Sequence, residues 1–480
     1  MFERQSAFVF ASGLMIIGFV AVGPVSAGEP ITAPVASVQV ATPLDSDLVA
    51  NTGDAPAVVY SGTIEVAGAA WLRLNFAEVM LSGSTPDGSG SYLRLTSVLD
   101  GGVQTLNATH VEQWQYKSAF FNGDAVLVEL IAYPGTGQNR LVINETTAAA
   151  AFPAPRSICG PDDDRALSND PRTGRTTNGC TCWIIDDINH CFLSAGHCAS
   201  GFDVVEFNVP LSDSNGNHIH APPEDQYAVD PASVQSNNGG IGNDWAYFGC
   251  FANPMTALTP FAAQGDFFVL SDAPPEVAGQ TIRITGFGST DPPVPQQWNF
   301  AQKTHTGPFV DSFGDTLKYA VDTSGGNSGS AVFNENTGEA IGIHTHAGCD
   351  PDPEDQGANH GTAIDQPGLQ NALANPQGVC VPVLGGCCVS FGCIVLTESI
   401  CQLNNGEFQG VATDCDPDPC PVCALQGDID QSGGVNGPDI SGYVRAKLGL
   451  PPEAGENQIC ANYGTGTLAG DNALFVADLL

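Results

Sequence analysis

Glycine and proline recur along most of this chain and limit the length of any helix that it can form. The 480 residues include 56 Gly and 34 Pro. Such a composition favours short strands joined by turns and loops, and a chain of this length is expected to fold as two to four domains. We therefore expect a mostly β protein with several domains.

The charge of the chain excludes one large class of partners. It carries 52 acidic and only 14 basic side chains, a formal net charge of −38. Because nucleic acids and anionic membranes are bound through basic surfaces that pair with phosphates, neither is expected as a partner. The excess of acidic groups is instead typical of a protein kept soluble outside the cell.

Residues 1–27 have the features of a secretory signal peptide. Arg4 precedes an apolar run over residues 7–22, and Val25-Ser26-Ala27 fits the small-residue rule for cleavage. An uncleaved anchor is the alternative, although glycines interrupt the run. We expect a secreted or cell-surface protein with no membrane contact after signal cleavage. In that compartment its 16 cysteines favour disulfides over metal thiolates.

The first folded segment predicts a β-sandwich. Residues 28–56 show no sustained period and are interpreted as a linker. From residue 57 to residue 147 short alternating runs appear, in which Leu72, Leu74 and Phe76 share one face. Turn signals separate these runs. We expect a sandwich that serves as an accessory domain or a pro-domain.

The second segment, residues 157–376, predicts a closed β-barrel architecture with functional loops. Apolar runs at 204–207, 280–284 and 340–343 read as strands, and long irregular connections separate them. Residues 367–374 could form one short helix. Chemistry is therefore sought in the connections.

One connection, residues 322–330, has the sequence Asp-Thr-Ser-Gly-Gly-Asn-Ser-Gly-Ser. The glycines permit a tight turn that exposes a serine. If Ser328 attacks a carbonyl, the N–H groups of Gly326 and Ser328 would point at the developing oxyanion. Gly/Ser clusters also mark ordinary loops, so the hypothesis needs a base and an acid elsewhere.

Two further stretches supply a candidate base and a candidate acid. His197 directly precedes Cys198. A Cys182–Cys198 disulfide across a strand-turn-strand would hold the histidine loop in place and stabilise the fold by about 3 kcal/mol through loop-closure entropy. Asp244 begins an apolar strand, where a buried carboxylate would orient the histidine tautomer. The order along the chain is His197, Asp244, Ser328.

These motifs resemble those of the chymotrypsin-fold serine peptidases, in which the histidine ends an Ala-x-His-Cys motif and the nucleophile lies in Gly-x-Ser-Gly. The resemblance covers about 220 residues and implies two six-stranded β-barrels with the triad in the cleft between them. It implies that Ser328 is the nucleophile, His197 the general base and then acid, and Asp244 the residue that orients His197. Gly326 and Ser328 would form the oxyanion hole. An inactive relative that keeps the barrel is the alternative.

Within this family the nucleophile loop is most similar to that of the glutamyl endopeptidases. The resemblance assigns Thr323 and His344 to the substrate carboxylate, which a hydroxyl and an imidazole N–H can bind without burying an unpaired charge. A protonated His344 would bind it better, so activity is expected to fall as His344 deprotonates. The implied activity is hydrolysis of protein or peptide substrates after Glu through an acyl-enzyme, with no cofactor for catalysis.

Two residues depart from the glutamyl pattern. Asp322 occupies the position at which trypsin-like enzymes keep the carboxylate that selects Arg or Lys, so Lys/Arg specificity is the alternative. His346 stands where most relatives have an aromatic pocket wall. A third histidine, His360, lies near the pocket positions in the sequence and is interpreted as structural.

The segment between the two domains bears on activation. It contains Arg156, Arg165, Arg172 and Arg175. Family resemblance suggests that cleavage there frees a new amino terminus that completes the pocket; a permanently attached accessory domain is the alternative. The pairing of the other cysteines in or beside the domain stays open. These are Cys159, Cys180, Cys191, Cys250 and Cys349.

Two small modules are expected at the carboxy-terminal end. Residues 379–423 contain eight cysteines, Cys380 to Cys423, and no histidine, which favours a disulfide-stapled module over a zinc site. Residues 424–480 resemble half of a dockerin, with one calcium loop followed by a short α-helical segment. The predicted Ca²⁺ ligands are Asp428, Asp430, Ser432, Asn436 and Asp439.

The carboxy-terminal modules also suggest a function of another class. A dockerin-like module implies a cohesin-like or cell-surface partner. The chain would then be an adhesion or scaffold component that carries a catalytically inactive barrel. The complete architecture predicted is a β-sandwich, a double β-barrel peptidase domain, a Cys-rich module and a dockerin-like segment.

Overall fold

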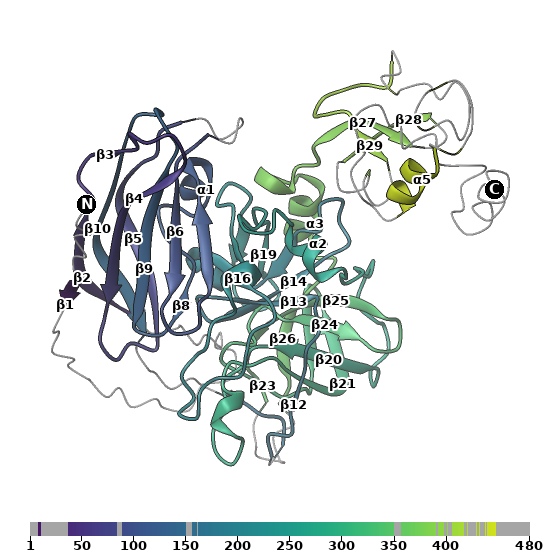
Figure 1. Cartoon of the computed structure of the whole chain (residues 1–480). Helices are drawn as coiled ribbons and strands as arrows, with labels where there is room; N and C mark the ends of the chain where they lie inside the picture. Colours follow the sequence, from purple (N-terminus) through teal and green to yellow (C-terminus); the bar gives the residue numbers. More distant parts are fainter. Residues whose placement is uncertain are drawn as a thin grey trace. The chain divides into compact units, whose positions relative to one another are not determined.

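The computed structural model (Figure 1) describes residues 8–10, 37–83, 89–149, 156–160, 162–349, 357–389 and 392–397, and short stretches between 401 and 447. Its residues divide into two compact units, residues 1–380 and residues 381–480. Strands dominate both, so the expectation of a mostly β protein is confirmed. No helix in the described part is both long enough and apolar enough to cross a membrane.

The amino-terminal domain is a sandwich of two sheets (Figure 1). The first sheet has the order β1 (Phe8–Phe10), β4 (Ala57–Glu65), β9 (Ala125–Ala132), β6 (Tyr92–Ser97), β7 (Val103–Leu106). The second has the order β2 (Ser37–Asp45), β10 (Gln138–Ala149), β5 (Trp71–Met80), β8 (Phe121–Asn122), with β3 (Val49–Ala50) paired to β10. One short helix, α1 (Ala108–Gln113), follows β7.

Part of the segment interpreted as a linker belongs to this sandwich. Strand β2 pairs with β10 over its length, and β3 adds a further pairing. Thr42 and Leu44 of β2 are buried, and the hydroxyls of Thr42 and Thr146 lie 2.7 Å apart. The apolar–polar alternation of β2 was not recognised in the sequence, because a polar threonine occupies one of its two buried positions. Of the predicted signal peptide only β1 is described, and the rest lies outside the described residues.

The next domain contains two seven-stranded sheets. In one of them β21 (Lys303–Phe313) pairs with both β20 and β22, which closes six strands into a barrel. The strand order is β12 (Ala166–Leu167), β21, β20 (Thr281–Gly286), β24 (Ala331–Asn334), β25 (Glu339–His346), β26 (Asn359–Ala363), β22 (Thr316–Tyr319). A separate pair joins β11 (Arg156–Ser157) to β23 (Thr323–Ser324).

The other sheet is not closed by pairs of named strands, unlike the second six-stranded barrel that the resemblance implied. Its order is β17 (Gln226–Ala228), β16 (Val204–Glu206), β13 (Thr173–Thr176), β14 (Cys180–Ile184), β15 (Phe192–Ser194), β19 (Asp244–Phe248), β18 (Gln235–Asn238). A single bridge between Val229 and Cys250 links the chain just beyond β17 to the chain just beyond β19.

Short helices decorate this domain. The expected helix over residues 367–374 is present as α3 (Pro367–Ala374). The others are α2 (Pro260–Gln264) and the 3₁₀ turns η1 (Gly196–Gly201), η2 (Pro223–Asp225), η3 (Gln296–Trp298) and η4 (Gly378–Cys380).

The sandwich and the double-sheet domain share a hydrophobic core. Val204 and Ala228, from the open sheet, belong to the same buried cluster as Trp71 and Phe120 of the sandwich. The amide of Gln226 also bonds the N–H and the carbonyl of Phe120, at 2.9 and 2.8 Å. Buried contacts of this kind make the two domains one packed unit.

The second unit is described in part. A three-stranded sheet of β28 (Gly392–Thr397), β27 (Leu384–Val389) and β29 (Glu407–Phe408) is followed by α5 (Asp439–Lys447). Its described residues form three disulfides: Cys387–Cys401, Cys388–Cys420 and Cys393–Cys415. Cys380, which we grouped with these cysteines, instead bonds Cys191 in the first unit.

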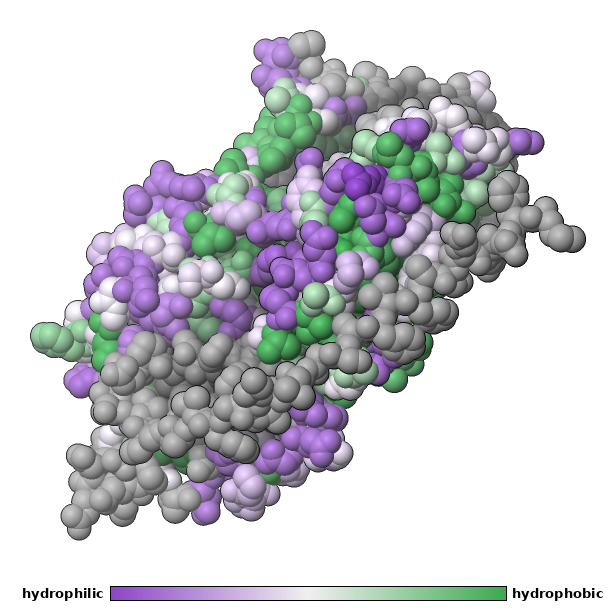
Figure 2. Space-filling model, turned by 90° about the vertical axis from the view of Figure 1, so that its left-hand side faces the viewer, coloured by the Kyte–Doolittle hydropathy of each residue, from purple (hydrophilic) through white to green (hydrophobic). Residues whose placement is uncertain are grey.

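On the face drawn in Figure 2, hydrophobic residues lie in small groups between hydrophilic ones.

Candidate active site

His197 and Asp244 are in direct contact. His197 lies in η1, directly after β15, and Asp244 is the first residue of β19. The Nδ1 atom of His197 lies 2.6 Å from Oδ2 of Asp244, and the backbone N–H of His197 donates to Oδ1 at 2.9 Å. Asp244 is fully buried. Oδ2 therefore orients the imidazole, with Nδ1 as the donor and Nε2 left to accept a proton, while Oδ1 holds the backbone of His197.

Asp244 is itself held by a residue that the sequence did not reveal. Its backbone N–H donates to Oγ1 of Thr362 at 3.1 Å, and that hydroxyl donates to the carbonyl of Asp244 at 2.8 Å. Thr362 lies in β26 of the closed barrel and is fully buried. No motif distinguishes this threonine from others in strands.

The loop that carries Ser328 orients two peptide groups. The carbonyl of Gly325 accepts from the N–H of Ser289 at 2.8 Å, and the carbonyl of Asn327 accepts from the N–H of Ser330 at 2.9 Å. Because a peptide is planar and trans, the N–H on its other edge points away from its carbonyl. The N–H groups of Gly326 and Ser328 are thus turned away from these contacts. Gly326 has φ of 107°, which favours glycine.

This loop packs against the open sheet beside His197. Thr181 of β14 donates from its backbone N–H to the carbonyl of Ser328 and from its hydroxyl to the carbonyl of Gly326, both at 2.8 Å. A Cβ on Gly329 would lie 2.2 Å from Oγ of Ser194 and 3.0 Å from the backbone nitrogen of Ala195. Ser328 therefore lies next to the strand end that leads into the histidine loop.

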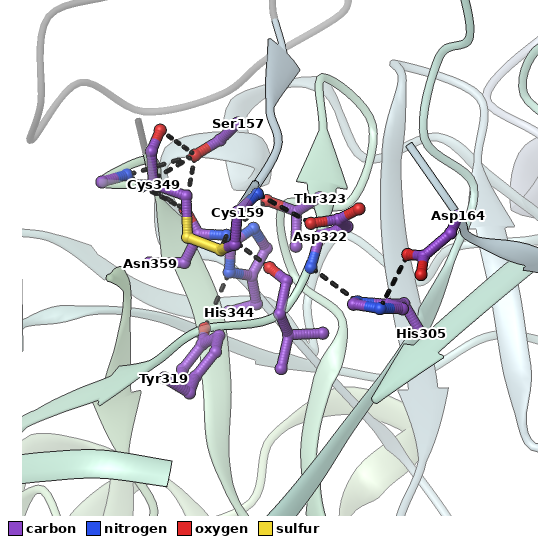
Figure 3. The surroundings of a disulfide bond; sticks show 12 residues. Ser157, Cys159, Asp164, His305, Tyr319, Asp322, Thr323, His344, Cys349 and Asn359 are labelled. Carbon is purple, nitrogen blue, oxygen red and sulfur yellow. Dashed lines mark hydrogen bonds and ion pairs between the residues drawn. A yellow bond between two sulfur atoms is a disulfide. The ribbon is translucent and has the colours of Figure 1, made fainter. Parts of the chain in front are cut away.

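Thr323 and His344 lie in a buried polar cluster (Figure 3). Asn359 donates to Oγ1 of Thr323 at 3.0 Å, and the hydroxyl of Tyr319 lies 2.7 Å from Nδ1 of His344. Asn359 and Tyr319 are also fully buried and were not singled out in the sequence. Nε2 of His344 has no hydrogen-bond partner among the described residues.

His344 is neutral at neutral pH, so the fall in activity that we expected as His344 deprotonates would lie well below neutral pH. Burial, reinforced by the neighbouring histidines His346, His197 and His360, lowers its pKa from 6.5 to about 3. A buried imidazolium without a paired anion is strongly disfavoured. The pocket therefore offers neutral donors.

The carboxylate of Asp322 is hydrogen-bonded to the first residues of the peptidase domain. Its Oδ1 accepts from the N–H of Cys159 at 2.7 Å, while Oδ2 has no hydrogen-bond partner among the described residues (Figure 3). Cys159 is fixed by a disulfide to Cys349. Burial raises the pKa of Asp322, which weakens its negative charge.

The other two histidines differ in position. Nδ1 of His346 lies 2.9 Å from Oγ1 of Thr345 and 3.9 Å from Oδ2 of Asp244, so this ring is on the side of the acid. His360 is partly buried, and its carbonyl accepts from the hydroxyl of Tyr319 at 3.2 Å. Burial lowers the pKa of both imidazoles.

The predicted Cys182–Cys198 disulfide is wrong, because Cys198 bonds Cys180. Cys180 begins β14 beside the turn where Asn178 donates to the carbonyl of Cys198 at 2.7 Å. Cys182 lies two residues further along the strand and is a buried free thiol, as is Cys250. The bridge still anchors the histidine loop, from a different residue.

The described residues include two groups with metal-ligating chemistry, and both are already satisfied internally. In the first, Cys180 and Cys198 beside His197 are joined in a disulfide. In the second, atoms of Asp164, His305 and Asp322 lie within 4.8 Å of one another. However, Nδ1 of His305 accepts from the N–H of Asp322 at 2.9 Å, and Nε2 lies 2.9 Å from Oδ1 of Asp164. With both ring nitrogens occupied, we assign no metal here.

The predicted calcium loop is described only in part. Asp428, Asp430 and Asn436 lie outside the described residues, whereas Ser432 and Asp439 are within them. Asp439 is fully buried at the start of α5, and its Oδ1 accepts from the N–H of Ile429 at 2.6 Å. Calcium binding stays a prediction.

Comparison with known proteins gives this arrangement a family context. Residues 180–343 match the family model described as a trypsin-like peptidase domain. The chain contains a trypsin-like peptidase domain. A glutamyl endopeptidase of Bacillus licheniformis is 24% identical over 239 residues, which span 45% of this chain and 70% of that protein.

Two solved structures match the chain at low sequence identity and low TM-score. A Glu endopeptidase is 20% identical, with a TM-score of 0.34, over 45% of this chain and 98% of that structure. A thermostable serine protease, AL20, from an extremophilic microorganism is 18% identical, with a TM-score of 0.29, over 42% and 95%. The peptidase domain has the chymotrypsin-like fold, with one closed barrel and one open sheet.

Proposed function

We propose that this chain is an exported serine endopeptidase that cleaves protein or peptide substrates after acidic residues. The observation that carries the proposal is the 2.6 Å contact between Nδ1 of His197 and Oδ2 of the buried Asp244. That contact supports a base oriented for proton transfer. The Ser328 loop, packed against the strand that leads into His197, supports the nucleophile.

The reaction follows from these groups. Nε2 of His197 takes the hydroxyl proton as Oγ of Ser328 attacks the substrate carbonyl carbon. The oxyanion so formed accepts hydrogen bonds from the N–H groups of Gly326 and Ser328, each worth roughly a hundred- to a thousandfold in turnover. His197 then gives its proton to the leaving amine, and an ester to Ser328 remains. Water, deprotonated by His197, attacks the ester carbon, and His197 returns the proton to Oγ of Ser328 as the acid product leaves.

Specificity for an acidic side chain is supported by two neutral donors. Thr323 accepts a hydrogen bond from Asn359, so its own hydroxyl proton stays available. The Tyr319 hydroxyl lies closer to Nδ1 of His344, at 2.7 Å, than to the carbonyl of His360, at 3.2 Å; in the arrangement in which it donates to Nδ1, the neutral ring carries its proton on Nε2. A carboxylate bound there would gain hydrogen bonds without an ion pair.

The alternative is Lys or Arg specificity through Asp322. The free Oδ2 of this buried residue favours it, since an unpaired carboxylate oxygen attracts a cation. Against it, Oδ1 is bonded to Cys159 and burial raises the pKa of the carboxyl. An inactive adhesion or scaffold protein, binding a cohesin-like partner, is the alternative from another class.

The test is kcat/KM for three matched peptides that differ only in Glu, Lys or Phe before the scissile bond. We expect Glu to be preferred, and Ser328→Ala to abolish hydrolysis of all three. A preference for Lys would replace the glutamyl assignment with the trypsin-like one. Equal hydrolysis by wild type and Ser328→Ala would exclude Ser328 as the nucleophile.

A further inference from the structure

Arg165 is a buried cation close to the nucleophile loop. It lies near the start of the peptidase domain, directly before β12, and only 4% of the residue is exposed. Its Nε and Nη2 donate to the two carboxylate oxygens of Asp163 at 2.8 and 2.7 Å. Although burial of Asp163 opposes it, these bonds lower the pKa of that carboxyl. The pair is therefore charged, and the remaining N–H donors of Arg165 are free to bond residues other than Asp163.

Those remaining donors contact the Ser328 loop. Nη1 of Arg165 donates to Oγ of Ser324 at 2.6 Å and to Oδ1 of Asn327 at 3.3 Å. Nη2 donates to the carbonyl of Ser289 at 2.7 Å. Asn327 is the residue directly before the proposed nucleophile. One guanidinium thus spans both ends of the turn.

The same atoms close the turn itself. Oδ1 of Asn327 accepts from the N–H of Ser324 at 3.0 Å, and the N–H of Asn327 donates to the carbonyl of Ser324 at 2.9 Å. A Cβ on Gly288 would lie 2.1 Å from Oδ1 of Asn327 and 2.6 Å from Nη1 of Arg165. Gly288 therefore packs directly against both groups, and loss of the buried guanidinium would leave a gap beside the turn.

The peptides that Arg165 braces are those that carry the oxyanion donors. The N–H of Ser289 fixes the Gly325–Gly326 peptide, and the carbonyl of Ser289 is bonded to Arg165. The side chain of Asn327, bonded to Arg165, belongs to the residue whose peptide supplies the N–H of Ser328. Oxyanion donors must be held in place before reaction to be effective.

We propose that Arg165 is a positioning residue that holds the Ser324–Ser328 turn in its catalytic conformation. Because this cation is part of the continuous chain, no new amino terminus is needed to form the oxyanion hole. The inference rests on the proposed role of Ser328. We therefore expect the enzyme to be active as an uncleaved chain with the sandwich attached.

The other contacts of the joining segment agree with an uncleaved chain. Arg156–Ser157 forms a strand pair with Thr323–Ser324, and the Cys159–Cys349 disulfide fixes the segment beside it (Figure 3). Arg175 is also buried, in a pair with Glu206 at 2.8 Å. A protease would have to extract Arg165 or Arg175 from the interior before cutting there.

The test compares Arg165→Met with Arg172→Met by thermal unfolding, kcat and KM on a Glu peptide. Arg172 pairs with Asp170 at 2.7 Å and lies 3.9 Å from the ring of Phe268, so it is a control that does not touch the turn. We expect Arg165→Met to lower kcat about a hundredfold with KM within about twofold. Arg172→Met should keep kcat within about twofold of wild type. Added guanidinium ion should restore part of kcat in Arg165→Ala.

A second variant keeps the test decisive if Arg165→Met does not fold. Ser324→Ala removes the 2.6 Å bond from Nη1, together with the 2.9 Å bond from the Ser324 hydroxyl to the carbonyl of Ser289, and should lower kcat roughly tenfold, again with KM unchanged. Unchanged kcat in a folded Arg165→Met, or in Ser324→Ala, would overturn the inference.

The covalent state of the active enzyme provides an independent check. Mass spectrometry of protein labelled by a fluorophosphonate should find the label on chains that are uncut between residues 156 and 175. Label confined to chains cut there would overturn the inference while leaving the proposed function intact. Wild-type protein that takes no label at all would instead contradict the proposed function, and this inference with it.

Discussion

Arg73 of the β-sandwich forms a 2.6 Å ion pair with Asp203 of the peptidase domain, and only 5% of the arginine side chain is exposed. Lys117 contacts the same carboxylate at 2.8 Å. Although burial opposes it, the charges of Arg73 and Lys117 lower the pKa of Asp203. The sandwich is therefore tied to the catalytic domain by charge as well as by a shared core.

Breaking this pair should destabilise the two domains together. Arg73→Leu leaves Asp203 without its closest cation, and we expect a loss of about 3 kcal/mol in the free energy of unfolding. Arg94→Leu is the control, because its ion pair with Glu129 lies within the sandwich and the arginine is 40% exposed. Chemical denaturation measures both. Separate transitions of the two domains in the wild type would contradict the shared core.

The buried His344 predicts how stability responds to acid. Its pKa is about 3 in the folded chain and 6.5 in the unfolded one. As the pH falls below 6.5 the unfolded chain takes up a proton that the folded chain refuses, so stability decreases until the pH passes the folded pKa. In His344→Gln the unfolded chain can no longer take up this proton. As the pH falls from about 6 to about 4, the free energy of unfolding of the variant should therefore decrease less steeply than that of wild type, by about 1.4 kcal/mol per pH unit. Identical slopes would contradict a neutral His344.

Asp322→Asn separates the two specificity readings. The amide oxygen of asparagine can still accept from the N–H of Cys159, so we expect a change of less than about 1 kcal/mol in stability. If Thr323 and His344 bind the substrate, the preference for Glu over Lys is kept. If Asp322 binds it instead, cleavage after Lys is lost in the variant. The measurement is kcat/KM on the Glu and Lys peptides for both proteins.

Calcium binding is tested by chelation. Asp428 is the first residue of the predicted loop, and one carboxylate contributes strongly to a site of this kind. Adding a chelator should lower the melting temperature of the carboxy-terminal unit in wild type but not in Asp428→Ala. Ser441→Ala, in helix α5 outside the predicted ligands, serves as the control. A chelator effect that persists in Asp428→Ala would rule out this loop as the site.

Much of the fold and part of the site follow from local sequence. Asp244 was expected at the start of an apolar strand and begins β19, and helix α3 spans the expected residues. The contact between His197 and Asp244 was also expected from their motifs. Such features depend on a few residues that are neighbours in the chain, so a single sequence is enough to predict them.

Other features depend on distant partners. Cys180 and Cys182 are two residues apart on one strand, and only the position of the histidine loop selects Cys180. Arginine is usually exposed, so Arg165 was counted among four candidate cleavage positions, with an uncleaved accessory domain as the alternative. Its partners Ser324 and Asn327 lie 159 and 162 residues away and bury it. The pKa of His344 likewise depends on burial by several strands.

Covalent labelling by a fluorophosphonate tests the central claim most directly, because this reagent reacts with a serine that has been activated as a nucleophile. Wild type, Ser328→Ala and His197→Ala are compared on one gel, with folding of each confirmed by thermal unfolding. We predict that wild type is labelled, Ser328→Ala is not, and His197→Ala reacts at least about a hundredfold more slowly. A folded wild type without label, or a Ser328→Ala variant labelled like wild type, would contradict the assignment of Ser328 as the nucleophile of a serine endopeptidase.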